Sequence, residues 1–135
     1  MQWNLLYMTP IDGALRCVKS QHVNDKIWIL PYNGKGLYLW EGSAWTYSEI
    51  QGQLQELDKN NCTIDGVAGQ ALVTATNYWI YAYLVSGVVH YEFSTQGPNT
   101  WDAGSGFIVK PNDVSKRLIG GCNFINNTVG FGINQ

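Results

Sequence analysis

The stretch YWIYAYLVSGVVHYEFS, from Tyr78 to Ser94, decides the fold of this 135-residue chain. It contains two runs of aromatic and β-branched residues, the types that strands favour, separated by Ser86-Gly87. A two-residue connection that includes Gly is typical of a tight β-hairpin. The first run, Tyr78 to Val85, is apolar or aromatic at odd and even positions alike. Both of its faces should therefore be covered, by a second sheet or by another subunit.

Further short strand patterns lie on either side of this hairpin, separated by Gly, Pro and Asn-Gly turns. The predicted strands cover residues 2–9, 15–19, 26–30, 37–40, 71–74, 106–110, 116–125 and 129–133, and Trp45 begins a return strand. About ten short strands at this spacing favour a sandwich or barrel. No internal repeat or linker is visible, so residues 1–135 are expected to form one domain. The sequence thus predicts an all-β fold, sandwich-like or jelly-roll-like.

A single short helix is predicted over about residues 49–59, as an addition to the strands. Ser48 occupies an N-cap position, and a Gln follows three residues later, as in a capping box. Ile50, Leu54 and Leu57 recur at helical spacing and form one narrow apolar stripe. We expect roughly two to three turns that pack this stripe on a sheet.

The composition excludes several function classes. Charged residues make up 13% of the chain, against about 25% in an average domain, and the net charge is −2. Neutralising a phosphate backbone needs clustered cations, and no run of Lys or Arg is present, so nucleic-acid binding is not expected. No apolar run approaches the roughly 20 residues that cross a bilayer, and no signal peptide is recognisable.

Chemistry-bearing side chains are few and scattered. Cys17, Cys62 and Cys122 are widely spaced and odd in number, so we expect free thiols rather than disulfides. The histidines, His22 and His90, do not complete a zinc-binding pattern with them. No EF-hand, phosphate-loop or GxSxG motif is present. The sequence therefore predicts a non-enzymatic protein without metal or cofactor, although carboxylates that pair only in space are invisible in sequence.

Four motifs follow one another in a fixed order along about residues 25–125. They are LPYNGKGLYLWEGSAW (30–45), Ser48-Glu49-Ile50 with two leucines behind it, the aromatic hairpin (78–94), and a string of the form Gly-x-x-Val-Lys, Asp, Arg-x-x-Ile-Gly (106–120). As an ordered set, they resemble the small β-domains of tailed-bacteriophage and prophage appendage proteins, such as tail fibres, head fibres and decoration proteins.

This resemblance implies a structural role in a virion, for a protein that is made in the host cytoplasm and has other virion proteins as partners. It also implies a homo-oligomer, usually a trimer. The aromatic residues of the hairpin would then lie in the core or at a subunit interface: Tyr78, Trp79, Tyr81, Tyr83, Tyr91 and Phe93. The part of the virion, the host and its receptor stay open.

A carbohydrate-binding module that recognises host-surface glycans is the alternative function. Aromatic rings stack on sugar faces, and a few well-placed polar groups fix the orientation of the ligand. Trp101 is the best candidate, because it lies in a polar loop with Asn99 and Asp102 beside it. The competing interpretation is that Trp101 caps the sandwich or a subunit contact. Trp45 with Tyr47 is a second candidate pair, unless Trp45 closes a turn in the core.

Overall fold

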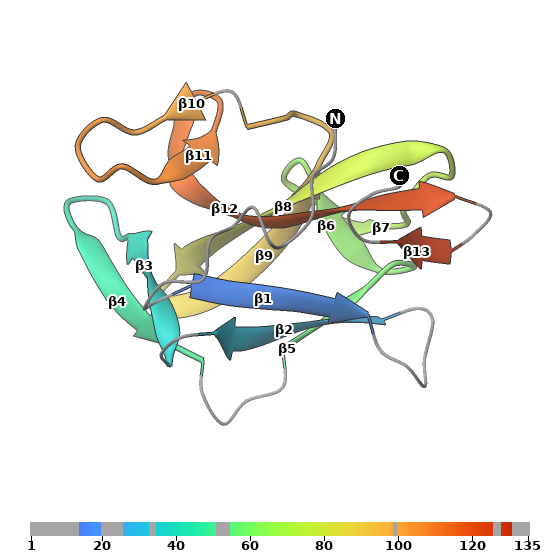
Figure 1. Ribbon diagram of the computed structural model, residues 1–135, viewed down its shortest axis with the longest axis horizontal. Coiled ribbons are helices and arrows are strands. Elements are labelled where there is room, and N and C mark those ends of the chain that lie inside the picture. The colour runs from blue at the N-terminus through green and yellow to red at the C-terminus, as the bar shows by residue number, and fades with distance from the viewer. Residues whose placement is uncertain are drawn as a thin grey trace.

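The fold is built from strands alone in the part of the chain that the structure describes. The computed structural model describes residues 14–19, 26–32, 35–50, 55–98, 100–125 and 128–130. The strand predicted over residues 2–9 lies outside these ranges, as does the end of the one predicted over 129–133. The described strands form three sheets, of three, eight and two strands (Figure 1). The prediction of an all-β, sandwich-like fold is confirmed.

The three-stranded sheet, called the small sheet below, contributes one wall of the core. Its three antiparallel strands are β1 (Ala14–Lys19), β2 (Lys26–Tyr32) and β5 (Gln55–Asp58), with β2 in the middle. Ile27 and Ile29 are fully buried, because alternate side chains of a strand point to the same face. Trp28 points to the other face and donates its indole N–H to Glu56 on β5, at 2.9 Å.

The β3–β4 hairpin forms the two-stranded sheet, from β3 (Gly36–Trp40) and β4 (Trp45–Glu49). Leu37 and Leu39 are fully buried, so one face of the hairpin packs on the core. Gly36 is required by a close approach of the two strands, because a Cβ there would lie 1.8 Å from the carbonyl oxygen of Ser48.

The large sheet is the centre of the molecule. Along the sheet its strands are β10 (Thr100–Trp101), β11 (Ile108–Lys110), β12 (Asp113–Ile125), β8 (Thr76–Val85), β9 (Val88–Ser94), β6 (Cys62–Ile64) and β7 (Val67–Gln70), with β13 (Thr128–Gly130) paired to β12. The pairings are antiparallel except that of β6 with β9, which is parallel at Ile64 and Phe93. The long strands β8 and β12 run across the middle of the molecule in Figure 1.

The hydrophobic core lies between the small sheet, the β3–β4 hairpin and one face of β8, β9 and β12. Ile80, Ala82 and Phe93 supply much of the large sheet's share. Burial of apolar surface contributes about 25 cal/mol per Å², so this core supplies most of the driving force for folding. Ile80, Tyr81 and Ala82 are consecutive and all 0% exposed, so the centre of β8 is covered on both faces within one chain.

The predicted helix over about residues 49–59 is wrong wherever the structure describes this segment. Glu49 ends β4 and Gln55–Asp58 forms β5, while residues 51–54 lie outside the described residues. The apolar stripe has another cause, because Ile50 is buried just after β4 and Leu57 pairs with Ile27 in the small sheet. Pairing between distant strands thus overrides a local helical pattern. Residues 71–74, predicted as a strand, form the connection after β7 instead.

Candidate functional site

The outer face of the β3–β4 hairpin carries four aromatic residues in two directly opposed pairs. Tyr38 lies opposite Tyr47, and Trp40 lies opposite Trp45. Leu37 and its alternate neighbours point to the core, so these four rings share the face that points away from it. We call this set the aromatic ladder.

The hydrogen-bonding pattern of the hairpin brings the paired rings together. Hydrogen bonds at its two ends, from Ile50 N–H to Lys35 O and from Glu41 N–H to Ala44 O, are both 2.9 Å long. Opposed pairs alternate between hydrogen-bonded and non-hydrogen-bonded positions, and side chains are closer at the second kind. Counting from the two ends places both ladder pairs at non-hydrogen-bonded positions.

Ring contacts follow from this spacing, and one pair is open to solvent. The centroids of Tyr38 and Tyr47 are 5.1 Å apart and those of Trp40 and Trp45 are 5.6 Å apart, both edge to face. Tyr38 is 45% exposed and Tyr47 is 37% exposed. The Tyr47 hydroxyl accepts a hydrogen bond from Lys35 N–H at 2.9 Å, which fixes the ring. The tyrosine end of the ladder is therefore an exposed aromatic surface in which the Tyr47 ring is held by a hydrogen bond.

The tryptophan end of the ladder is closed by residues from β12 and the loop before β11. Phe107 packs edge to face on Trp45, with 4.9 Å between centroids, and the Arg117 guanidinium lies 3.8 Å from the Phe107 centroid. Arg117 also donates from Nη1 to the carbonyl oxygen of Tyr38 at 3.0 Å. Burial lowers the pKa of Arg117 to about 10. Sequence reasoning missed Phe107 and Arg117, although both belong to the last of the four motifs.

Of the trio of residues predicted to bind sugar, the structure describes only the side chain of Asp102, so that site stays a prediction. Trp101 belongs to β10, but its side chain lies outside the described residues, as does Asn99 altogether. The Asp102 carboxylate accepts hydrogen bonds from Ser105 N–H and Oγ–H at 2.9 and 2.7 Å. Asp102 N–H donates to Phe107 O at 2.9 Å, so Asp102 holds the loop that carries Phe107.

The aromatic residues of the β8–β9 hairpin divide between the two faces of the large sheet. Tyr78 and Phe93 pack edge to face in the core, at 5.9 Å between centroids, and Tyr91 packs against the same core. On the opposite face Tyr81 is fully buried, Trp79 and Tyr83 are half-buried, and Trp79 lies against Gly97. Tyr81 donates its hydroxyl to Gln96 O at 2.8 Å. Both faces are thus partly covered without a second subunit.

A group of buried charges lies on the outer face of the large sheet. Glu92 on β9 has a fully buried side chain, and it accepts from Lys110 and Lys116, each at 2.8 Å. Lys110 also contacts Asp65 at 2.9 Å, and Asp65 accepts a hydrogen bond from the Ser94 hydroxyl. We call Asp65, Glu92, Lys110 and Lys116 the lysine–carboxylate network. Its charges balance, two against two, and every member has a partner.

The electrostatics of this network favour the charged forms. Burial opposes charge on Lys110, but hydrogen bonds and charges from Glu92 and Asp65 outweigh it, so the pKa of Lys110 is raised. Burial also opposes charge on Asp65, yet hydrogen bonds from Ser94 and Lys110 leave its pKa lowered. Lys116 lies 3.9 Å from the centroid of the Tyr83 ring, which stacks on His90 at 5.9 Å. Each charged group of the network has a partner of opposite charge inside it, which suits a structural role.

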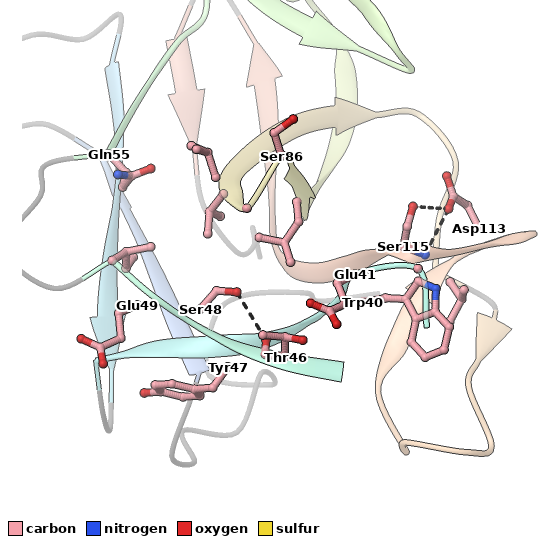
Figure 2. Close-up of a pocket in the computed structure, with 17 residues that line it drawn as sticks. Trp40, Glu41, Thr46, Tyr47, Ser48, Glu49, Gln55, Ser86, Asp113 and Ser115 are labelled. Atoms are coloured by element: carbon pink, nitrogen blue, oxygen red, sulfur yellow. Dashed lines mark hydrogen bonds between the residues drawn. The ribbon is translucent and has the colours of Figure 1, made fainter. Parts of the chain in front are cut away.

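A groove of about 980 Å³ separates β4 from the turn between β8 and β9. Figure 2 shows Glu49 and Gln55 toward one end, Asp113 and Ser115 beside Trp40 toward the other, and Glu41 and Ser48 between them. Further lining residues are Gly42, Thr46, Tyr47, Ile50, Leu84, Ser86, Gly87, Val88, Val89 and Val114. We call this the β4 groove. The sequence does not predict it, because its walls come from five separate segments of the chain.

The described residues hold little reactive chemistry. Cys62 is half-buried and Cys122 buried, both are free thiols, and burial raises their pKa values to about 11 and about 12. The Cys17 side chain lies outside the described residues. Among those described, no group of three or more His, Cys, Asp or Glu side chains could hold a metal ion. Within the same ranges, no helix is long and apolar enough to cross a membrane.

Comparisons with protein-family models, with curated proteins and with solved structures find no match to this chain. The candidate sites therefore rest on geometry alone. They are an exposed aromatic ladder and, beside it, a groove with an acidic lining.

Proposed function

We propose that this chain is a structural module of a virion appendage or decoration, located in the virion and working through protein–protein contacts as a homo-oligomer. One observation carries the proposal: residues of three of the four ordered motifs contact one another. Trp45 of the first motif packs on Phe107 of the last. Glu92 of the hairpin motif pairs with Lys110 of the last. The residues behind the resemblance to phage appendage domains thus form one connected scaffold.

The surface character supports a role in contacts. Exposed large apolar side chains are unevenly placed, and contact surfaces are enriched in aromatic residues. The exposed large apolar side chains among the described residues are Tyr38, Tyr47, Val67, Val73, Val85, Val88 and Ile108. The two tyrosines form one end of the aromatic ladder, and Val85 and Val88 flank the β8–β9 turn. Such patches often mark interaction sites in soluble proteins.

The test is the solution mass of the full chain, from light scattering after size-exclusion chromatography at micromolar concentration. We expect a stable trimer of three 15.1-kDa chains. The double variant Tyr38→Ser/Tyr47→Ser should dissociate it if the ladder is at the interface, and Val73→Ser serves as a control for lost surface hydrophobicity elsewhere. A 15.1-kDa monomer at all concentrations would overturn the homo-oligomer.

Glycan binding is the second candidate function, and the open tyrosine end of the ladder favours it. Tyr38 and Tyr47 present exposed ring surface, the Tyr47 ring is held by a hydrogen bond from Lys35 N–H, and a pre-ordered ring binds at a lower entropic cost. A glycan array should then show binding that Tyr47→Ala abolishes and that Trp101→Ala leaves unchanged. The opposite pattern would return the site to Trp101, and an array without binding to the folded wild type would reject this candidate.

A further inference from the structure

The β4 groove follows the edge of a strand rather than the face of a sheet. Its lining includes five consecutive residues, 46–50. Alternate side chains of a strand point to opposite faces, so a cavity on one face would contact only every second residue. A run of consecutive lining residues therefore places the groove along the backbone edge of β4.

That edge carries backbone groups that are not used by β3. The hydrogen bonds from Ile50 N–H to Lys35 O and from Glu41 N–H to Ala44 O fix which β4 residues face β3. By the same alternation, the N–H and C=O groups of residues 45, 47 and 49 point away from β3. Within the described residues β4 pairs with β3 alone. An open edge of this kind is a template for one more strand.

The charge of the groove selects the partner. Among the residues that the structure describes, its lining contains Glu41, Glu49 and Asp113 but no Lys, Arg or His. Asp113 is occupied by the Ser115 N–H and hydroxyl, whereas Glu41 and Glu49 are exposed at the two sides of β4. Leu84, Val88 and Val89, together with Ile50, supply an apolar wall. An extended segment that alternates basic and apolar residues matches both properties.

We propose that the β4 groove binds an extended basic segment of a partner protein, which adds to β4 as an antiparallel or parallel strand. The five consecutive lining residues 46–50, four from β4 and one just after it, correspond to about 17 Å of extended chain, so about five residues of the partner would be engaged. The proposal rests on the proposed function only in taking that partner to be another structural protein. A second copy of this chain is a poorer occupant, because pairing two β4 edges would bring two acidic grooves together.

The experiment uses the full, isotope-labelled chain and an end-capped seven-residue peptide of alternating lysine and valine, followed by NMR of the backbone amides. We expect saturable shifts at residues 45, 47 and 49 and at the β8–β9 turn. The double variant Glu41→Gln/Glu49→Gln should weaken binding by about fivefold or more. Glu56→Gln, which removes an exposed charge outside the groove, should leave the affinity unchanged.

A second probe tests the strand pairing without altering the protein. Two isomers of the same peptide are N-methylated, one at the odd and one at the even residues, so each keeps its charge but cannot donate hydrogen bonds from one edge. The isomer whose methylated edge faces β4 should bind at least about fivefold more weakly than the other. If a glutamate–valine peptide binds as tightly as the lysine–valine peptide, the charge argument is overturned. If the two methylated isomers bind equally tightly, the added strand is overturned. Shifts confined to other surfaces would overturn the site. None of these results depends on whether the chain forms the trimer expected above, so the two proposals fail separately.

Discussion

The β8–β9 and β3–β4 hairpins both pair aromatic residues across antiparallel strands, yet one is core and the other is surface. Tyr78 and Phe93 are 2% and 1% exposed, whereas Tyr38 and Tyr47 are 45% and 37% exposed. The first hairpin lies between β12 and β6 in the eight-stranded sheet, and the second has no further strand beside it among the described residues. Position relative to other strands, rather than aromatic content, decides the role of a ring.

The strongest test of this contrast removes one ring from each hairpin. Phe93→Ala should lower the free energy of unfolding by about 4 kcal/mol, because it leaves a cavity in the closed core. Tyr47→Ala should cost less than about 1 kcal/mol, since the ring is already partly in water. Urea unfolding followed by tryptophan fluorescence measures both. Similar losses for the two variants would contradict the contrast.

The second test concerns the charges behind the β8–β9 hairpin. Glu92→Gln should cost about 3 kcal/mol, because Lys110 and Lys116 stay largely buried and lose their shared carboxylate. Glu56→Gln on the exposed surface should stay within about 0.5 kcal/mol of wild type. The same urea titration reads both. A neutral Glu92→Gln would mean that the network adds no stability.

The third test acts on the β3–β4 hairpin itself. Gly36→Ala should cost about 2 kcal/mol, because the new methyl group would meet the carbonyl oxygen of Ser48 and separate the two strands. Gly104→Ala is the matched control, since its methyl group would meet only the Asp102 carboxylate, at an ordinary 3.6 Å. Thermal unfolding by circular dichroism compares them. Equal melting temperatures of the two variants would show that β3 and β4 can move apart without a loss of stability.

A fourth test measures the pair on the open face. A double-mutant cycle of Tyr38→Ala and Tyr47→Ala should give a coupling energy of about 0.5 kcal/mol, the size expected of an exposed cross-strand aromatic pair. Chemical denaturation of the four proteins in the cycle supplies it. A coupling energy of zero would mean that the rings pack independently, which would weaken their use as one binding surface.

The smallest effect is the pH dependence that Asp65 confers. Its pKa is lowered in the folded state, where hydrogen bonds from Ser94 and Lys110 outweigh burial. Such a group contributes stability above its unfolded pKa of about 3.9 and loses it as the pH falls through the folded value. The stability gap between wild type and Asp65→Asn should thus be constant near pH 7 and close below about pH 4. Urea titrations across this range check it, and a gap that widens in acid would refute the assignment.

Local patterns were enough to predict most strands but not the segment around Ile50. The β8–β9 hairpin was predictable because its residue types and its Ser86-Gly87 turn agree. The helix prediction failed because spacing alone cannot separate one face of a helix from two strand ends that are buried for different reasons. Ile50 contacts the core just after β4 and Leu57 does so from β5 in another sheet, and that difference depends on long-range pairing.

The candidate sites were less predictable than the fold. Trp45 and Tyr47 were singled out together, and the structure places both on the ladder. Their extension by Phe107 and Arg117 depends on residues more than 60 positions away, which no local pattern connects. The lysine–carboxylate network has the same origin, since Lys110 reaches Asp65 across 45 positions. Sites built on sheet pairing become visible only once the register is known.

The parallel pairing of β6 with β9 has a consequence for synthesis on the ribosome. Ile64 is synthesised well before Phe93, with which it pairs between β6 and β9. The short β6–β7 hairpin is only marginally stable by itself. The β6–β7 hairpin therefore has no third strand to pair with until β9 has been made. Late, non-local pairing slows folding and leaves strand edges open in the meantime. A chain arrested on the ribosome before residue 94 should accordingly remain sensitive to protease at β6–β7.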